Sequence, residues 1–276
     1  LTLIVGVSAL LSPLASNAVV LERDSKIMIL AVLVLVAAIL EPFSPGVVSF
    51  WEGLALLVLF FAYLSFLYSQ REEALTSFQF SIFVDYLIRL RFLTSLRGAL
   101  QKPQRPRRRS KTKSQEDTGS QSQIARNGAI VIISLVMIVL GAQILITSVD
   151  YIATTWGISE GLIGLTLVAI GTSMPELAVS INSAKRGFGR LLIGNVIGSN
   201  IVNITLGLGI GALLLPVGIG LVQGLFMAQF AAIVAIIFHY IIRRDWRVTR
   251  KEGIFLLFLF VFAQVVLSFI TQFIIG

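Results

Sequence analysis

Long apolar runs, separated by short polar or basic segments, dominate the chain. Three runs come before residue 70, at about 1–20, 27–40 and 47–68. Five more follow, and each is long enough to cross about 30 Å of hydrocarbon as a helix of roughly 20 residues. These five cover about 128–149, 158–184, 191–215, 218–242 and 253–275. The pattern predicts an all-α polytopic membrane protein with about eight spans.

The segment between the two groups of runs is different. Residues 78–96 mix aromatic residues with Asp85, Arg89 and Arg91, which is typical of an amphipathic helix at a membrane interface. Residues 101–123 are polar, rich in Pro, Ser and Gln, and predict a disordered linker because they have nothing to bury. We therefore expect three parts: 1–69, 70–127 and 128–276.

Composition excludes several function classes. Of the 276 residues, 56% are hydrophobic and 13% are charged, which excludes an ordinary soluble domain. The chain has no cysteine, so a disulfide, a thiolate metal site and a cysteine nucleophile are excluded as well. The sequence shows no hydrolytic or redox motif. An enzyme is the class we least expect, and we expect no cofactor.

The basic residues predict an orientation. The net charge of +8 would suggest a nucleic-acid partner in a soluble protein. Here alternate threading of the spans places all 22 Lys and Arg on one side of a membrane, in 22–26, 70–126, 185–190 and 243–251. The positive-inside rule makes that side cytoplasmic and puts the C-terminus outside. The expected partner is a lipid bilayer and not a nucleic acid; the sequence leaves the oligomeric state open.

Two stretches of the first group recur in the second. Leu1–Pro13 matches Ile204–Pro216 at an offset of 203, with seven identities in 13 positions. Glu52–Phe60 matches Glu252–Phe260 at an offset of 200. The predicted orientation gives matched segments opposite directions, which indicates inverted repeats. The offset places the start of the first repeat about 75 residues before Leu1. We expect a first copy of the polar motif at 171–176 to lie in that segment.

A polar motif, GTSMPE, interrupts the apolar run at 158–184. Its proline, Pro175, has no N–H group and clashes with the carbonyl about one turn earlier. The helix is therefore expected to open near Gly171 and to leave carbonyls, such as that of Ala169, without a helical partner. In lipid these carbonyls need another partner, which a cavity or an ion provides.

The same motif carries a carboxylate and two hydroxyls. Thr172, Ser173 and Glu176 lie at i, i+1 and i+4, so their oxygens can converge on one side of the break. A proline kink or a single hydroxyl means little alone in a membrane helix. An ionised carboxylate near the bilayer centre, however, costs a few kcal/mol or more. Glu176 is therefore the strongest single indication of a binding site.

A second polar stretch, GNVIGSN at 194–200, follows a short basic turn. Ser199 and Asn203 are four residues apart and share a helix face, where they can add oxygen ligands. Na⁺ and Ca²⁺ both take oxygen ligands, and Ca²⁺ takes six to eight, more than one broken helix supplies. Four glycines in and after this stretch form two small-xxx-small spacings, which permit close helix approach: Gly194, Gly198, Gly207 and Gly211.

The combination GTSMPELAVS…GNVIGSNIVN resembles an alpha-repeat of the cation/Ca²⁺ exchanger superfamily, of the prokaryotic sodium/calcium exchanger type. The resemblance is close over 165–216 and, through the repeat and the orientation, covers most of the chain. It implies an inverted-repeat bundle of ten spans: 1–69 would hold the end of span 3 and spans 4 and 5, and 128–276 would hold spans 6 to 10. It also implies Na⁺/Ca²⁺ antiport by alternating access in a prokaryotic plasma (inner) membrane.

The resemblance also implies a set of ligands for the transported Na⁺ and Ca²⁺. Carried over by motif, they are the carbonyl of Ala169 and the side chains of Thr172, Ser173, Glu176, Ser199 and Asn203. The family has Asn or Asp at position 203, and Asp accompanies K⁺ co-transport, so Asn203 weighs against K⁺ dependence. The partner repeat is implied to supply a second glutamate. Because Glu176 balances one charge of Ca²⁺, residues 1–276 alone are expected not to transport.

Two other functions remain open at this stage. One is an antiporter that couples to protons or moves another divalent cation, although the Gly-Asn-x-x-Glu motif of the proton-coupled branch is absent. The other is a non-transporting membrane scaffold with the basic linker as its working part. Transport that responds to pH rather than to Na⁺ would favour the first, and a gene without a second GTSxPE-like motif would favour the second. His239, near the cytoplasmic end of its span, is interpreted as an interface residue.

Overall fold

The computed structural model describes residues 1–17, 20–42, 44–69, 80–90, 117–157, 163 and 168–270. These residues are almost entirely helical, and the strands among them are two residues long. The chain forms two compact units, one made of 1–100 with 172–276 and the other of 101–171. Each unit is described by itself.

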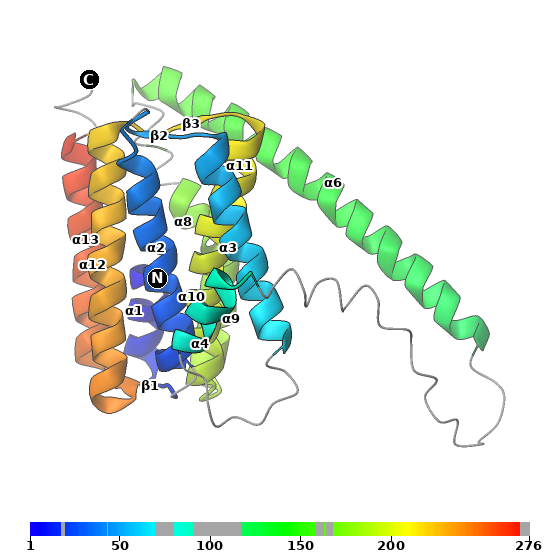
Figure 1. The fold of residues 1–276 in the computed structure, drawn as a ribbon, viewed down its shortest axis with the longest axis horizontal. Coiled ribbons are helices and arrows are strands. Elements are labelled where there is room, and N and C mark those ends of the chain that lie inside the picture. Colours follow the sequence, from blue (N-terminus) through cyan, green and yellow to red (C-terminus); the bar gives the residue numbers. More distant parts are fainter. Residues whose placement is uncertain are drawn as a thin grey trace. The chain divides into compact units, whose positions relative to one another are not determined.

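The first unit is a bundle of helices joined by short turns and ribbons (Figure 1). Its first part contains α1 (Thr2–Leu11), β1 (Leu14–Ala15), the π-helix η1 (Val20–Ser25), α2 (Lys26–Ile39), β2 (Val47–Val48), α3 (Phe50–Ser69) and α4 (Phe80–Ile88). Its second part contains α9 (Met174–Lys185), α10 (Gly189–Val202), the π-helix η3 (Asn203–Gly207), α11 (Leu208–Leu214), β3 (Val217–Gly218), α12 (Leu221–Asp245), β4 (Arg247–Val248) and α13 (Arg250–Ile270).

Four helices in the described part of the chain are long and apolar enough to cross a membrane. They are Phe50–Tyr68, Gly189–Leu214, Leu221–Asp245 and Arg250–Ile270. The helix Thr2–Leu11 is apolar but shorter. The predicted all-α membrane fold is confirmed.

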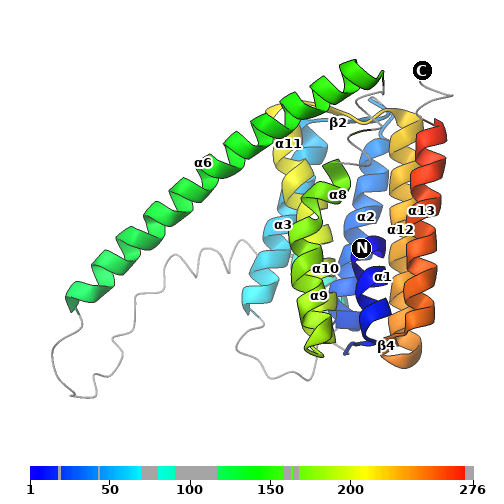
Figure 2. The ribbon, with the colours of Figure 1, turned by 180° about the vertical axis from the view of Figure 1, so that it is seen from behind.

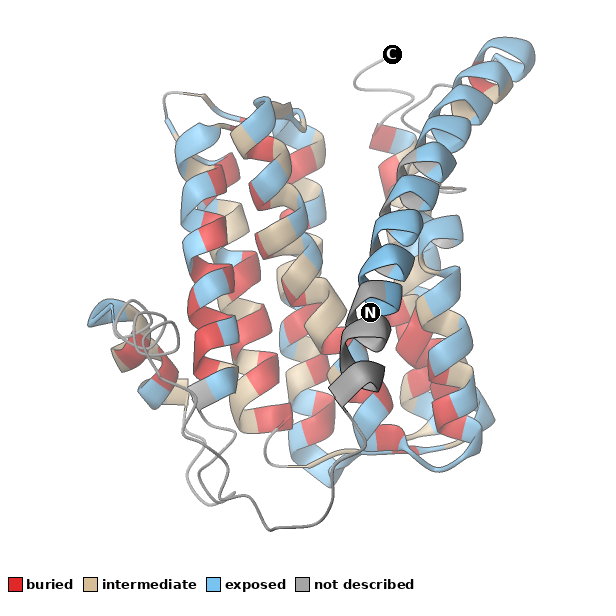
Figure 3. Cartoon of the chain, turned by 90° about the vertical axis from the view of Figure 1, so that its right-hand side faces the viewer, coloured by how far each residue is buried: buried red, intermediate tan, exposed pale blue. Residues whose placement is uncertain are grey.

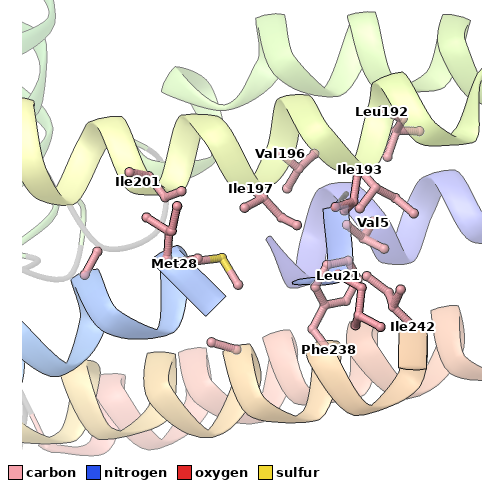
Figure 4. Close-up of a cluster of buried hydrophobic side chains, with 14 of the residues drawn as sticks. Val5, Leu21, Met28, Leu192, Ile193, Val196, Ile197, Ile201, Phe238 and Ile242 are labelled. Atoms are coloured by element: carbon pink, nitrogen blue, oxygen red, sulfur yellow. The ribbon is translucent and has the colours of Figure 1, made fainter. Parts of the chain in front are cut away.

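The core of the first unit is built around α10. Leu192, Ile193, Val196, Ile197 and Ile201 form one fully buried stripe on this helix. Figure 4 shows the stripe facing side chains of α1, η1, α2 and α12, and Figure 3 shows buried residues recurring along the bundle helices. Lipid tails are as apolar as these side chains, so close packing, rather than removal from water, holds such helices together.

Two ribbons show the symmetry of the first unit. β1 pairs with β4, with Leu14 opposite Val248, and β2 pairs with β3, with Val48 opposite Val217. The repeat offsets of 203 and 200 carry Leu14 onto Val217 and Val48 onto Val248, so each ribbon is the image of the other. The two ribbons lie at opposite ends of the bundle (Figures 1 and 2). This arrangement is the one expected of inverted repeats.

Helix packing repeats the same symmetry. α1 packs against α13, and its symmetry mate α11 packs against α3. A Cβ on Gly6 would come within 3.0 Å of the carbonyl oxygen of Gly253, and a Cβ on Gly209 within 3.2 Å of that of Gly53. Gly6 and Gly209 are matched by the repeat, as are Gly53 and Gly253. Each repeat therefore contributes one helix to each of two equivalent close contacts.

Close approach at the predicted glycines of α10 is not found. A Cβ on Gly194 or Gly198 would meet no atom of the described chain within 4 Å. A Cβ on Gly211 would meet only a side-chain carbon of Val217, at 3.7 Å. The close backbone contact of α10 is instead at its first residue, where a Cβ on Gly189 would lie 2.6 Å from the backbone nitrogen of Ala15. The face of α10 that carries Gly194 and Gly198 is not part of this contact.

The first apolar run also differs from its expected form. It was predicted to continue to about residue 20, but α1 ends at Leu11, because Pro13 cannot continue the helix and the chain turns into β1. The polar run 22–26, predicted as a boundary, lies inside η1 and the start of α2. Its charges are paired locally, Arg23 with Asp24 at 2.6 Å and Lys26 with Glu22 at 2.5 Å. This pairing lets the helix include them.

α4 lies within the segment predicted as an amphipathic helix. Phe83 and Tyr86 are buried on one side of it, and the Tyr86 hydroxyl lies 2.7 Å from Ser65 Oγ of α3. Asp85 and Arg89 form an ion pair at 2.6 Å with much of each side chain exposed. The helix is thus two-faced; its position at a membrane interface stays a prediction. Residues 70–79 and 91–100 lie outside the described part.

The second unit contains α6 (Asp117–Trp156). The predicted disordered linker extended to residue 123, but residues 117–123 are helical, so that part of the prediction is wrong. A helix already nucleated in the apolar run at 128–149 extends at little cost, since each added residue gains one backbone hydrogen bond. Residues 101–116 lie outside the described part.

Candidate functional site

The helix break predicted at the first polar motif is present. The short helix α8 (Ala169–Thr172) ends just before Ser173, which is in a turn, and α9 starts at Met174. Pro175 lies in the first turn of α9, where its missing N–H removes no helical hydrogen bond. At the start of α9, the N–H of Leu177 donates to the carbonyl of Ser173 at 2.9 Å. The break is thus two residues beyond the predicted Gly171.

The second polar stretch is irregular as well. α10 ends at Val202, and the chain widens into the π-helix η3, of which Asn203 is the first residue. The Thr205 hydroxyl donates to the carbonyl of Ile201 at 2.7 Å within this segment. Single π-turns inside helices occur frequently at functional sites. The sequence predicted the polar face here but not the change of helix type.

These two irregular segments share one polar cavity of about 360 Å³. α9 and α10 lie next to each other in the bundle (Figure 2), and α1 packs against α9. The cavity is lined by Leu1, Ile4, Thr172, Ser173, Glu176, Ser199, Asn200 and Asn203. Five of the six residues predicted from the sequence are therefore brought together, and the apolar residues Leu1, before α1, and Ile4, in α1, also line the cavity.

The sixth predicted residue belongs to the other unit. Ala169 is the first residue of α8 and falls in the unit that ends at Gly171. The role of its carbonyl as a ligand stays a prediction.

Glu176 carries the main electrostatic feature of the cavity. Its Oε2 is buried and has no hydrogen-bond partner among the described residues. A buried polar atom without a partner costs about 1–3 kcal/mol, and more when it is charged. Glu176 lies in the first turn of α9, where the positive end of the helix dipole favours a negative charge. The arrangement keeps a carboxylate oxygen available for a cation.

Ser199 and Asn200 use their donors within α10. The Ser199 hydroxyl donates to the carbonyl of Val196 at 3.0 Å, and the Asn200 amide Nδ2 donates to the same carbonyl at 2.7 Å. With their hydrogens directed to Val196, the oxygens of both side chains remain as acceptors. These oxygens, with the carboxylate of Glu176, are the kind of ligand that a hard cation takes.

Asn200 lines the cavity too; the sequence offers it as an oxygen ligand of the second polar stretch, but the set implied by the family resemblance did not include it. It lies three residues before Asn203, a spacing that places both on one helix face. That spacing was the available signal. Asn195, in the same motif, is exposed and does not line the cavity.

His239 lies outside the cavity. It is half-buried on α12, and its Nδ1 is 2.7 Å from Ser25 Oγ, which donates to the carbonyl of Leu21 at 2.6 Å. Since the serine proton goes to Leu21, the imidazole Nδ1–H is the donor to Ser25. His239, which the sequence predicts to be an interface residue, therefore also forms a hydrogen bond between α12 and the end of η1.

Comparison with known proteins identifies the family. Residues 1–69 and 127–269 match the sodium/calcium exchanger protein family, which covers most of the chain. The chain belongs to this family. The exchanger is 34% identical over 275 residues to the sodium/calcium exchanger MaX1 of Methanosarcina acetivorans, and the match covers 97% of this chain and 76% of that protein. It is 36% identical over 134 residues to an uncharacterized membrane protein of Methanocaldococcus jannaschii, covering 49% and 43%.

A solved structure supports the same assignment. The exchanger resembles the sodium-calcium exchanger NCX_Mj, soaked with Na⁺ and Sr²⁺, with a TM-score of 0.57 and 26% identity. The match covers 96% of this chain and 71% of that chain. The predicted exchanger-like helical bundle is confirmed, and the family is one of transporters that exchange cations with Ca²⁺.

Proposed function

We propose that this exchanger binds Ca²⁺ and Na⁺ alternately in the cavity at Glu176 and moves them in opposite directions across the membrane. The observation that carries the proposal is the buried Glu176 Oε2, without a partner among the described residues, in a polar cavity between two interrupted helices. Irregular backbone at membrane depth is tolerated where it lines such a cavity. Discontinuous helices near the midplane are the usual ion sites of inverted-repeat transporters.

The ligands follow from the lining. The side-chain oxygens of five cavity residues face a cation from two sides: Thr172, Ser173 and Glu176 at the α8–α9 break, and Ser199 and Asn203 at the α10–η3 junction. Asn200 adds a sixth oxygen, and the carbonyl of Ala169 completes the proposed set. Ca²⁺ takes six to eight oxygens at flexible geometry, whereas Na⁺ can use a subset of the same ligands. Competition for one set of ligands couples the two fluxes.

Binding of Ca²⁺ requires more negative charge than the cavity residues supply. Glu176 supplies one negative charge against the two of Ca²⁺, and the other lining residues are neutral. We propose that a second carboxylate, from the first copy of the repeat, completes the site. We therefore do not expect residues 1–276 on their own to exchange Ca²⁺.

Alternating access follows from the repeats. α1 packs against α13, and α11 packs against α3. The two repeats therefore make equivalent helix contacts, while their matched helices run in opposite directions. Exchanging the conformations of the two repeats would open the cavity to the other side. An ion shifts this equilibrium only by its differential affinity for the two states, so a loaded site is proposed to be required for the change.

We propose that the β1–β4 end faces the cytoplasm. This end gathers positive charge: Lys185 is the last residue of α9 and Arg186 follows it, Arg243 and Arg244 lie in the last turn of α12, and Arg247 lies in β4. The β2–β3 end carries no Lys or Arg in its connecting loops, 41–49 and 215–220. A prokaryotic plasma (inner) membrane with this orientation satisfies the positive-inside rule.

Competition between the ions is the direct test of a shared site. Ca²⁺ binding to the purified full-length protein, measured by calorimetry, is expected to weaken as Na⁺ replaces choline at constant ionic strength. A dependence on Na⁺ steeper than first order would show that several Na⁺ ions displace one Ca²⁺. Ca²⁺ affinity that is the same in Na⁺ and in choline would contradict a shared site.

Exchange is expected not to require K⁺. Position 203 holds the neutral Asn203, so no extra carboxylate is present there to bind a further monovalent cation. Replacing external K⁺ with choline at fixed membrane potential is expected to change the Na⁺-driven Ca²⁺ flux by less than about twofold, a difference of under 0.5 kcal/mol. Loss of the flux on K⁺ removal would overturn this assignment.

A further inference from the structure

Three serines beyond the cavity have a buried Oγ without a partner among the described residues, Ser8, Ser16 and Ser180, and two of them lie within helices. Ser8 of α1 and Ser180 of α9 are both 0% exposed. The Oγ atom of each has no hydrogen-bond partner among the described residues. Neither residue lines the cavity or takes part in the close glycine contacts, so neither is explained by the features described above.

Other hydroxyls in these helices behave differently. Thr205 donates to Ile201 O at 2.7 Å, Ser268 to Gln264 O at 2.7 Å, and Ser25 to Leu21 O at 2.6 Å. Bonding back to the carbonyl four residues earlier is the ordinary way for a membrane helix to satisfy a hydroxyl. Ser8 and Ser180 do not adopt it, although a missing bond costs about 1–3 kcal/mol at a buried site. A water molecule or ion is the remaining kind of partner.

The two serines extend the cavity in one direction. Ser180 lies one turn after Glu176 on α9, and Ser8 lies one turn after Ile4 on α1; Glu176 and Ile4 both line the cavity. One turn advances a helix by about 5.4 Å. α1 and α9 pack against each other, and both run from the cavity toward the β1–β4 end (Figures 1 and 2). Ser183, at i+7 from Glu176, continues the same face and is 7% exposed.

We propose that Ser8 and Ser180 line the cytoplasmic half of the ion pathway, closed in this structure and hydrated when the exchanger opens inward. This inference rests on the proposed function. Alternating access needs a route from the cavity to each side of the membrane, and the two serines would line the route to the cytoplasm. In the closed state α1 and α9 pack together and bury both hydroxyls. Separation of the helices by a few ångströms would admit water, which would hydrate both hydroxyls and a cation leaving Glu176.

Cysteine accessibility tests the pathway without relying on transport. The 276 residues contain no cysteine, so Ser8→Cys and Ser180→Cys each introduce a single thiol into this part of the protein, with little change in volume. The variants are made in full-length protein that carries no other cysteine and is inserted in vesicles with known orientation. A charged, membrane-impermeant methanethiosulfonate is then added to one side at a time. Ala62→Cys, in α3, is the matched control because Ala62 is also 0% exposed but lies away from the cavity.

The expected result is modification of both serine variants from the cytoplasmic side only. The rate is expected to exceed that of Ala62→Cys by more than about tenfold, because an inward-open minor state exposes the pathway more often than unfolding exposes the core. Modification from the outer side only, or rates equal to the Ala62→Cys control, would overturn the proposal. If the pathway is labelled but Na⁺ fails to drive Ca²⁺ flux, the proposed function fails and the pathway stands. If flux is normal but the serines stay unlabelled, only the pathway fails.

Discussion

Replacing Glu176 with glutamine in the full-length protein is expected to abolish exchange while leaving the protein folded. The substitution keeps the size of the side chain and removes the only carboxylate among the cavity residues. A unit charge at about 4 Å from a monovalent cation contributes about 4 kcal/mol near a protein surface, and more for a divalent one. We therefore expect Ca²⁺ affinity to fall by more than about a hundredfold and Ca²⁺ flux to fall to the level of empty vesicles.

Separate controls test whether Glu176→Gln still folds and whether removal of any carboxylate has the same effect. Because Glu176 Oε2 has no partner among the described residues, Gln at this position breaks no hydrogen bond of that atom with them, and an unchanged elution profile and unfolding temperature are expected. Glu22→Gln is the matched control, since it removes a carboxylate that pairs with Lys26 on a partly exposed surface. Exchange at the wild-type rate in Glu176→Gln would show that the cavity is not the transport site.

Gly253→Val is expected to destabilise the bundle strongly. A Cβ at this position would lie 2.9 Å from the Cβ of Ala9 and 3.0 Å from the carbonyl oxygen of Gly6. A backbone atom cannot move aside as a flexible side chain can, so α13 must separate from α1. Overpacking of this kind costs about 1–3 kcal/mol, and a β-branched side chain adds to it. A lower unfolding temperature and a lower yield of folded protein in detergent are the measured results.

The symmetry of the bundle supplies a second variant. Gly53→Val places a Cβ 2.8 Å from Ala212 Cβ and 3.0 Å from the carbonyl oxygen of Gly209, so its loss of stability is expected to match that of Gly253→Val. Gly128→Val, in α6, would meet no atom within 4 Å and is the control, with a change within about 0.5 kcal/mol. Unequal losses at Gly53 and Gly253, with one variant like the control, would contradict the reciprocal packing of the repeats.

Much of the fold could be predicted because a bilayer limits what a chain can do. Apolar runs of about 20 residues can only be helices there. The repeat at offsets near 200 predicted an inverted pair, and the Leu14–Val248 and Val48–Val217 ribbons agree with it residue by residue. The distribution of Lys and Arg predicted the loops that gather at the β1–β4 end.

The parts of the site that are determined by covalent geometry within one helix could be predicted from the sequence. Pro175 must interrupt its helix, and residues at i, i+1 and i+4 around the break must share a side, so Thr172, Ser173 and Glu176 were found together as expected. The same reasoning placed Ser199 and Asn203 on one face. Their meeting across the cavity depended on the family resemblance, since spacing within a helix says nothing about its neighbours.

The remaining features depend on contacts between distant segments. The π-helix at Asn203 has no sequence marker, and neither does the η1 segment that keeps 22–26 helical. GxxxG spacing on α10 permitted close approach at Gly194 and Gly198, but the helices approach closely at the pairs Gly6–Gly253 and Gly53–Gly209, whose members are far apart in the sequence. Ser8 and Ser180 differ from other helical serines only in the three-dimensional structure, where their hydroxyls have no partner.

Na⁺-driven Ca²⁺ uptake is the measurement that tests the central claim most directly. The full-length protein is reconstituted into vesicles loaded with Na⁺ and diluted into Na⁺-free buffer containing radioactive Ca²⁺, with Glu176→Gln measured in parallel. The account predicts uptake that requires internal Na⁺ and is absent from the variant. Uptake that ignores Na⁺ but follows an imposed pH gradient would contradict it.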